Sequence, residues 1–255
     1  MAAGITCLCP TYGRFTQLRV SLACFIEQDF PDRQLFILND APVPITCNVP
    51  GVTIINAERF PNLGEKRAYL LNLAQTEIVA HWDDDELYLP WHLSTGMHIL
   101  ATRPEISCVK ASVAPNVCGP DDKLQNLGFS RQKFDASMIF RKQRAIELGA
   151  SLSLRVSARS GLVVKVQIGG YMPVTGAESR QLLTVLKHAR ELYEIPIKEA
   201  CPSYVWRLLD GRKGHVRHTG TSQRFWERNT DFADGPLTPA DLGPIKEQIG
   251  DLWTS

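Results

Sequence analysis

The chain has 255 residues, 44% of them hydrophobic, and its 28 basic side chains nearly balance 27 acidic ones. A chain of this length can bury one large core or two small ones, and we expect one α/β domain. The formal net charge of +1 is too small to indicate electrostatic binding to nucleic acid or to an acidic membrane surface. A long polyanion is therefore not expected as a partner, and we predict no nucleic-acid binding.

The seven cysteines are odd in number and scattered, whereas a zinc site needs paired spacing. We therefore expect reduced, buried thiols. No segment approaches the roughly 18 to 20 apolar residues that span a bilayer, and the opening MAAG lacks the charged and apolar regions of a signal peptide. The sequence predicts a cytoplasmic protein with no transmembrane segment, and it leaves peripheral membrane contact open.

Over the first hundred residues, apolar runs alternate with amphipathic patterns, which is typical of βαβ units and a mainly parallel sheet. The expected strands cover residues 5–9, 35–38, 52–56 and 77–82. The expected helices cover residues 15–26, 63–73 and 91–102. Pro90 lies where the last of these helices would begin, since a first helical turn tolerates proline.

Beyond residue 103 the periodicity is weaker. The expected strands cover residues 106–113, 137–140 and 204–209, and the expected helices cover residues 141–148, 178–192 and 241–253. A polar loop over residues 115–133 is predicted to lie over a pocket. Residues 211–224 are basic and rich in glycine, which predicts a mobile loop.

Three consecutive carboxylates, Asp83, Asp84 and Asp85, directly follow the fourth expected strand. Like charges this close raise one another's pKa unless a cation or a set of donors offsets them, so we expect positive charge beside them. In an extended segment Asp83 and Asp85 point one way and Asp84 the other, which suits two partners such as a metal ion and a sugar hydroxyl. The alternative is an N-cap cluster for the next helix, although one cap needs only one carboxylate.

Other polar residues follow the first two strands, and ligands of open α/β sheets bind at the carboxyl ends of strands. Thr11 or Tyr12 is placed to contact a base or ribose, and Asp40 to accept a hydrogen bond from either. We expect phosphate to be met by Arg14 and by Lys66 or Arg67. The alternatives are that Tyr12 packs in the core and that the three basic residues are solvated on helix surfaces.

The segments CPTYGRFTQLRVSLACFIEQDFPDRQLFILNDA and NLGEKRAYLLNLAQTEIVAHWDDDELYLP resemble the nucleotide-binding half of family 2 glycosyltransferases. The resemblance covers about residues 4–102 and depends on the order and separation of the motifs. It implies the GT-A fold, a single Rossmann-like mixed, mainly parallel sheet flanked by helices. The implied glycosyltransferase domain covers residues 1–210, with a nucleotide-binding half at 1–102 and an acceptor half at 103–210. Residues 211–255 would form a C-terminal loop and helix extension.

The resemblance also implies roles for particular residues. Those after the first strand would cradle the nucleotide, Asp40 would meet its base, and Asp83 to Asp85 would form the D-x-D motif. Asp85, with Asp83, would bind Mn²⁺ or Mg²⁺ bridging the diphosphate, since hard oxygen ligands suit these ions. Asp84 or Asp83 would meet ribose or the donor sugar. The implied nucleotide-binding set is Pro10, Thr11, Tyr12, Arg14, Asp40, Lys66, Arg67, Asp83 and Asp84.

The second half is implied to supply the acceptor site and a base for an inverting displacement. The family often shows a Gly-Gly-aromatic turn followed by an acidic pair, and this chain has one such turn at 169–171 followed by Glu178. Glu178 is the candidate base, or else an ordinary first-turn glutamate stabilised by the helix dipole. His215 or His218 is a candidate metal ligand, or else a solvated loop residue.

The implied activity is metal-dependent, inverting transfer from a nucleoside diphosphate sugar, expected to be a UDP-sugar, to the hydroxyl of a carbohydrate or other acceptor. The processive Q-x-x-R-W pattern is missing after Glu178, so we expect a non-processive enzyme. A domain that binds nucleotide sugar without transfer stays open, as does a nucleotidyltransferase, although the segment after the first strand contains only one glycine. A dehydrogenase would need G-x-G-x-x-G there.

Overall fold

The computed structural model describes residues 4–112, 114–118, 125–130, 135–149, 154–157, 163–166, 179–195 and 204–208. The expected helix over 241–253 and the expected loop over 211–224 lie outside these residues, as does the Gly-Gly-aromatic turn.

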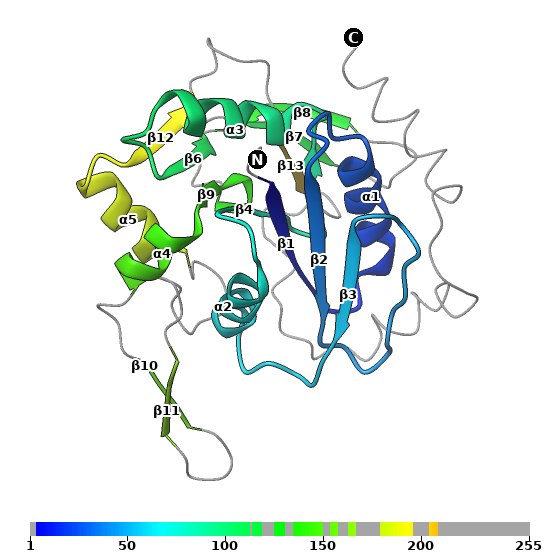
Figure 1. The fold of residues 1–255 in the computed structure, drawn as a ribbon. Helices are drawn as coiled ribbons and strands as arrows, with labels where there is room; N and C mark the ends of the chain where they lie inside the picture. The colour runs from blue at the N-terminus through cyan, green and yellow to red at the C-terminus, as the bar shows by residue number, and fades with distance from the viewer. Residues whose placement is uncertain are drawn as a thin grey trace.

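A seven-stranded sheet forms the centre of the fold, in the order β12-β6-β9-β4-β1-β2-β3 (Figure 1). Its strands are β1 (Ile5–Thr11), β2 (Arg33–Asn39), β3 (Val52–Asn56), β4 (Ile78–His81), β6 (Cys108–Ala111), β9 (Ile139–Arg141) and β12 (Leu192–Ile195). β1 pairs in parallel with β2 and β4, β2 with β3, and β6 with β12, whereas β9 is antiparallel to β4 and β6. The prediction of a mixed, mainly parallel sheet is confirmed.

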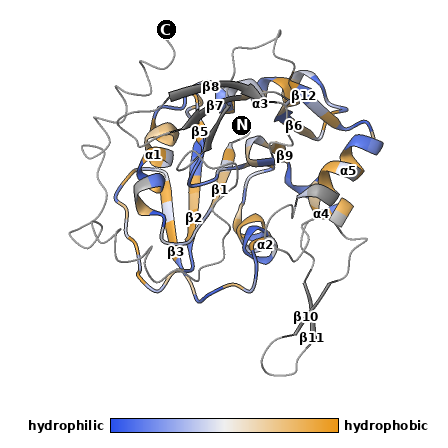
Figure 2. Cartoon of the chain, turned by 180° about the vertical axis from the view of Figure 1, so that it is seen from behind, coloured by the Kyte–Doolittle hydropathy of each residue, from blue (hydrophilic) through white to orange (hydrophobic). Residues whose placement is uncertain are grey.

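Helices cover both faces of this sheet. They are α1 (Phe15–Ile26), α2 (Leu63–Leu73), α3 (His92–Thr102), α4 (Lys142–Gly149) and α5 (Arg180–His188), with a short 3-10 turn at Asp135–Ser137. Alternate residues of β1 enter different cores, because successive side chains of a strand point to opposite faces. Cys7 and Cys9 pack with α1 and α3, and Leu8 packs with α2, α4 and α5. Figure 2 shows the hydrophobic residues concentrated along β1, β2 and β3.

A smaller four-stranded sheet has the order β5-β13-β7-β8. Its strands are β5 (Leu87–Tyr88), β13 (Tyr204–Leu208), β7 (Ala114–Cys118) and β8 (Gln125–Ser130), and a separate hairpin joins β10 (Leu154–Ser157) to β11 (Val163–Val166). The predicted loop over residues 115–133 is therefore wrong where β7 and β8 lie. The sequence APNVC carries no clear alternation, and the pairing itself is irregular between Pro115 and Val117, so tertiary contacts decide this strand.

The helix predicted over 178–192 ends early, and β12 begins at Leu192. Arg190 adopts a left-handed conformation with φ of 60°, and the Glu191 N–H donates to the Leu186 carbonyl. These features resemble a Schellman-type helix end, which needs a left-handed residue that is usually glycine. Because this residue is arginine, the usual sequence signal for a helix end is missing.

The core contains large aromatic side chains as well as cysteines. Trp82 is fully buried and stacks on Tyr88 with ring centroids 3.9 Å apart. The cysteines whose surroundings the structure describes are free thiols, and all but the half-buried Cys47 are buried: Cys7, Cys9, Cys24, Cys47 and Cys108. Within the described ranges, no helix has the length and apolar character needed to cross a membrane.

Gly96 lies where α3 packs tightly against Ile139 of β9. A Cβ atom there would lie 2.3 Å from Cδ1 and 3.2 Å from Cβ of buried Ile139. In a helix interior, alanine is normally more stabilising than glycine by about 1 kcal/mol. Overpacking a core, however, destabilises the folded protein by about 1–3 kcal/mol. We expect Gly96→Ala to lower the free energy of unfolding by up to about 2 kcal/mol in urea titrations. His98→Ala on the exposed side of α3 is the control, and a more stable Gly96→Ala protein would contradict this packing.

Candidate functional site

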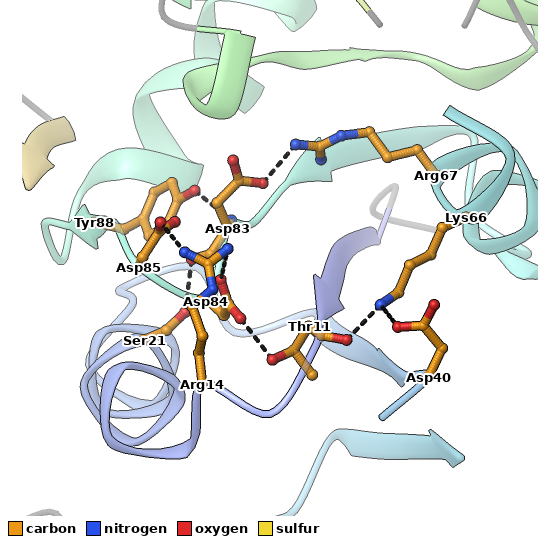
Figure 3. A network of polar contacts seen from close by, with 10 residues as sticks. All are labelled: Thr11, Arg14, Ser21, Asp40, Lys66, Arg67, Asp83, Asp84, Asp85 and Tyr88. Atoms are coloured by element: carbon orange, nitrogen blue, oxygen red, sulfur yellow. Dashed lines mark hydrogen bonds and ion pairs between the residues drawn. The ribbon is translucent and has the colours of Figure 1, made fainter. Parts of the chain in front are cut away.

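The polar residues that follow β1, β2 and β4 come together at one edge of the sheet, as predicted from the topology (Figure 3). Thr11 ends β1, and its hydroxyl donates to Asp84 Oδ2 at 2.6 Å across 73 positions of sequence. Asp40 directly follows β2, and Lys66 on α2 connects the two strand ends. The Lys66 ammonium donates to the Thr11 carbonyl and to Asp40 Oδ1.

Two arginines balance the charge of the aspartate triplet. Arg14, just before α1, pairs with Asp84 Oδ1 at 3.0 Å and also with Asp85 Oδ2. Arg67 on α2 donates to Asp83 Oδ1 at 2.7 Å from the opposite side, as Figure 3 shows. Each carboxylate of the triplet therefore has a guanidinium partner, which satisfies the expectation of positive charge beside them.

The triplet is not extended, which corrects the expected alternation of its side chains. Residues 84–85 form a turn, so Asp84 and Asp85 share Arg14 while Asp83 reaches Arg67. The side chain of Asp84 is 1% exposed, against 12% for Asp85 and 23% for Asp83. Tyr88 supports the turn, because its hydroxyl accepts from the Asp83 N–H at 2.7 Å.

The alternative of an N-cap cluster is wrong. Helix α3 begins after Trp91, whose side chain makes no capping hydrogen bond, and the Leu93 N–H in its first turn donates to Gln28 Oε1 and not to an aspartate of the triplet. The alternative of solvated basic residues is also wrong, since Arg14, Lys66 and Arg67 are 6%, 4% and 2% exposed. All three face carboxylates here.

The start of α2 positions the two buried cations Lys66 and Arg67. Asn62 caps this helix by accepting from the Glu65 N–H at 3.0 Å, and its amide donates to the Glu65 carboxylate at 2.7 Å. This reciprocal pair resembles a capping box, which fixes where the first turn begins. The next two residues in the helix therefore point toward the strand ends.

Burial dominates the electrostatics of this cluster. It raises the pKa of Asp84 to about 7, although Arg14 acts in the opposite direction. Burial also lowers the pKa of Lys66, and Asp40 offsets part of that effect. For Arg14 burial disfavours the charge, but Asp84 and Asp85 outweigh it and raise the pKa of the guanidinium. The cluster is thus a set of charges that depend on one another for stability.

Arg59 is a site residue that the sequence did not reveal. It lies between β3 and α2, where its Nη1 donates to Asp40 Oδ2 at 2.9 Å and its guanidinium carbon lies 3.8 Å from the centre of the Tyr12 ring. The backbone N–H of Phe60 donates to the same Asp40 oxygen at 2.9 Å. A lone arginine in the segment NAERFPN carries no motif, so its role depends on the fold.

Two hollows adjoin these residues, and both are lined by Tyr12, Asp40 and Arg59. The larger has a volume of about 480 Å³ and extends along the segments after β2 and β3. The smaller has a volume of about 20 Å³ and is also lined by Pro10, Thr11 and Lys66. Tyr12 is half-buried and lines both hollows, so it is not fully packed in the core.

The donor set at the triplet is suited to a divalent cation. Asp83 and Asp85 offer partly exposed carboxylate oxygens, and Mg²⁺ usually takes only one or two protein carboxylates beside waters and substrate phosphates. Among the described residues, no group of three His, Cys, Asp or Glu side chains is arranged to hold a metal by itself. A cation at this position would therefore share its shell with a ligand and would take the place of arginine contacts. The candidates Glu178, His215 and His218 lie outside the described residues.

No protein-family model and no curated protein matches the sequence. Solved structures do match the fold. One is S. aureus TarS 1-349, with a TM-score of 0.51 at 12% identity over 80% of this chain and 60% of that chain. Another is the same TarS segment in complex with UDP-GlcNAc, with a TM-score of 0.51 at 12% identity over 98% of this chain and 73% of that chain.

The chain has the GT-A fold. At this level of identity the likeness concerns the fold alone, and in the first of these matches the chain spans 60% of the TarS segment. The mixed, mainly parallel sheet of this chain, with helices on both faces, is consistent with this fold. The seven-stranded sheet of this GT-A fold also places Thr11, Asp40 and the triplet at one edge.

Proposed function

We propose that the protein is a glycosyltransferase that uses a nucleoside diphosphate sugar, with a UDP-sugar as the expected donor. The observation that carries this proposal is the convergence of Thr11, Asp40 and the aspartate triplet at the carboxyl edge of a GT-A sheet. Ligands of open α/β sheets bind at this edge. One of the matching structures is TarS in complex with UDP-GlcNAc, which supports a nucleotide-sugar donor here.

The cleft offers separate places for the parts of such a donor. The base would lie by Tyr12 and Asp40, which line the larger hollow, and Asp40 would accept a hydrogen bond from a ring N–H. Pro10 and Thr11 would line the path of the ribose. The diphosphate would meet the cationic side of the cluster, formed by Arg14, Lys66 and Arg67, because guanidinium and ammonium groups bind phosphate oxygens.

A divalent cation, Mn²⁺ or Mg²⁺, would be held by Asp85 with Asp83, and a late histidine, His215 or His218, is a further candidate ligand. When bound, such an ion would supply Lewis-acid stabilisation of the leaving diphosphate. Arg14 would then exchange one of its carboxylate partners for a phosphate. Asp84 stays buried on Thr11 and keeps the turn in place.

The acceptor hydroxyl would lose its proton to Glu178 as it attacks the anomeric carbon from the face opposite the leaving group. This single displacement inverts configuration, and we propose that it transfers one sugar at a time. In this proposal Glu178 belongs to the acceptor half, and it would act as the general base toward the acceptor hydroxyl.

A nucleotide panel tests this proposal. We expect UDP with Mn²⁺ to stabilise the folded protein by about 2.7 kcal/mol at a concentration 100 times its Kd, and thermal melts measure this shift. A chelator should remove most of it. Hydrolysis of UDP-sugars, followed with and without chelator, then separates a transferase from a domain that only binds. If no nucleoside diphosphate in the panel shifts the melting temperature, the proposed function is wrong.

A further inference from the structure

Arg59 contacts both residues that we propose to bind the nucleobase, Tyr12 and Asp40. Its guanidinium lies over the face of the Tyr12 ring, 3.8 Å from the ring centre to the guanidinium carbon, and its Nη1 donates to Asp40 at 2.9 Å. Its side chain is 48% exposed, whereas the Asp40 side chain is fully buried. A side chain held mainly by these two contacts can leave without disturbing the core.

Both carboxylate oxygens of Asp40 already accept hydrogen bonds, and Oδ2 accepts two. Oδ1 accepts from Lys66, and Oδ2 accepts from both Arg59 and the Phe60 N–H. A carboxylate oxygen has about two lone-pair positions, so Oδ2 is saturated while Arg59 is in place. A further in-plane N–H donor can reach this oxygen only where Arg59 now donates.

Arg59 also borders both hollows of the cleft. Both are lined by Arg59, Tyr12 and Asp40, one of about 480 Å³ and one of about 20 Å³. The smaller hollow is also lined by Thr11 and Lys66. Movement of the Arg59 side chain would therefore open space on the side of Tyr12 and Asp40 that faces both hollows.

A guanidinium is planar and carries N–H donors in its plane, and it stacks on aromatic faces. A nucleobase with a ring N–H has the same three properties. We propose that Arg59 occupies the place of the donor nucleobase in the ligand-free protein and swings out when the nucleotide binds. This inference rests on the proposed function. Lys66 is buried and stays as the counter-charge of Asp40 during the exchange.

The exchange makes Arg59 a competitor of the nucleotide, so its removal should tighten binding. The cation–π contact and the ion pair of an arginine that is half exposed to water are each weak, and the two together correspond to about 3- to 30-fold in affinity. We expect Arg59→Ala to lower the Kd for UDP and for uridine by this factor in isothermal titration calorimetry. The Kd for pyrophosphate should not fall, because pyrophosphate has no base.

Arg103→Ala is the matched control, since the Arg103 guanidinium carbon lies 4.2 Å from the ring centre of Tyr193 in a pair far along the sheet. We expect it to leave the Kd for UDP unchanged. Weaker or unchanged UDP binding by Arg59→Ala would overturn the inference while leaving the proposed function standing, as would an equal gain for pyrophosphate. If neither the wild type nor Arg59→Ala binds any nucleoside diphosphate, the proposed function itself fails, and this inference with it.

Discussion

Replacing Asp85 with alanine is expected to reduce sugar transfer by a factor of about 10³ or more, because an ion or dipole aimed at the developing charge of a leaving group contributes several kcal/mol to the transition state. Asp85 is the more buried of the two accessible carboxylates of the triplet, and it pairs with Arg14. The measurement is the rate of release of the nucleoside diphosphate from the sugar nucleotide at saturating Mn²⁺. The thermal shift produced by UDP should also lose its dependence on Mn²⁺.

The fold should survive this substitution. Arg14 retains its pair with Asp84, so no buried cation is left without a partner. Asp29→Ala, which changes an exposed acid away from the triplet, is the matched control for the loss of one carboxylate. A protein with alanine at position 85 that keeps metal-dependent turnover would remove Asp85 from the mechanism.

Arg14→Met is expected to lower the free energy of unfolding by about 3–5 kcal/mol, the usual cost of removing one partner from a buried ion pair. Arg14 is 6% exposed and serves two carboxylates, of which Asp84 is fully buried. Methionine keeps much of the length of the arginine side chain, so the loss of stability comes mainly from the missing positive charge. Urea titrations at pH 8 measure it, with Arg103→Met, which changes an exposed arginine, as the control.

The loss should depend on pH in a defined direction. Burial raises the pKa of Asp84 to about 7, and removing Arg14 takes away an influence that lowers it. A carboxyl with a raised pKa in the folded state binds its proton more tightly there than in the unfolded chain, where its pKa is about 3.9. Stability is therefore lost as the pH rises, and the deficit of Arg14→Met at pH 5 should be smaller than at pH 8.

Asp84→Asn in the same chain should restore part of the stability that Arg14→Met removes at pH 8. The amide is neutral and can still accept from Thr11. Equal deficits at both pH values, with no gain from the amide, would show that Arg14 stabilises the fold through packing and not through its charge.

The first hundred residues were predicted well from the sequence, because the local periodicity and the tertiary packing favour the same elements there. Helices α1 and α2 have the predicted bounds, and β3 does as well. Strong apolar periodicity and short connections leave few alternatives in such a βαβ pattern. The small sheet was not predicted from the sequence. Its strand β5 has only two residues, and β7 lacks the alternation of apolar and polar residues that marks a strand.

The amino-acid sequence by itself determined the alternating elements, the polar residues at the strand ends and the need for positive charge beside three aspartates. Only the tertiary structure decided which cations meet which acids. The paired residues lie far apart in the sequence. Arg14 and Asp85 are 71 positions apart, Lys66 and Asp40 are 26 positions apart, and Arg59 and Asp40 are 19 positions apart. No local pattern encodes such pairs, because they depend on where strands and helices stop in space and on how much water the packed core excludes. The fold therefore turned a run of like charges into a balanced cluster at the edge of a cleft.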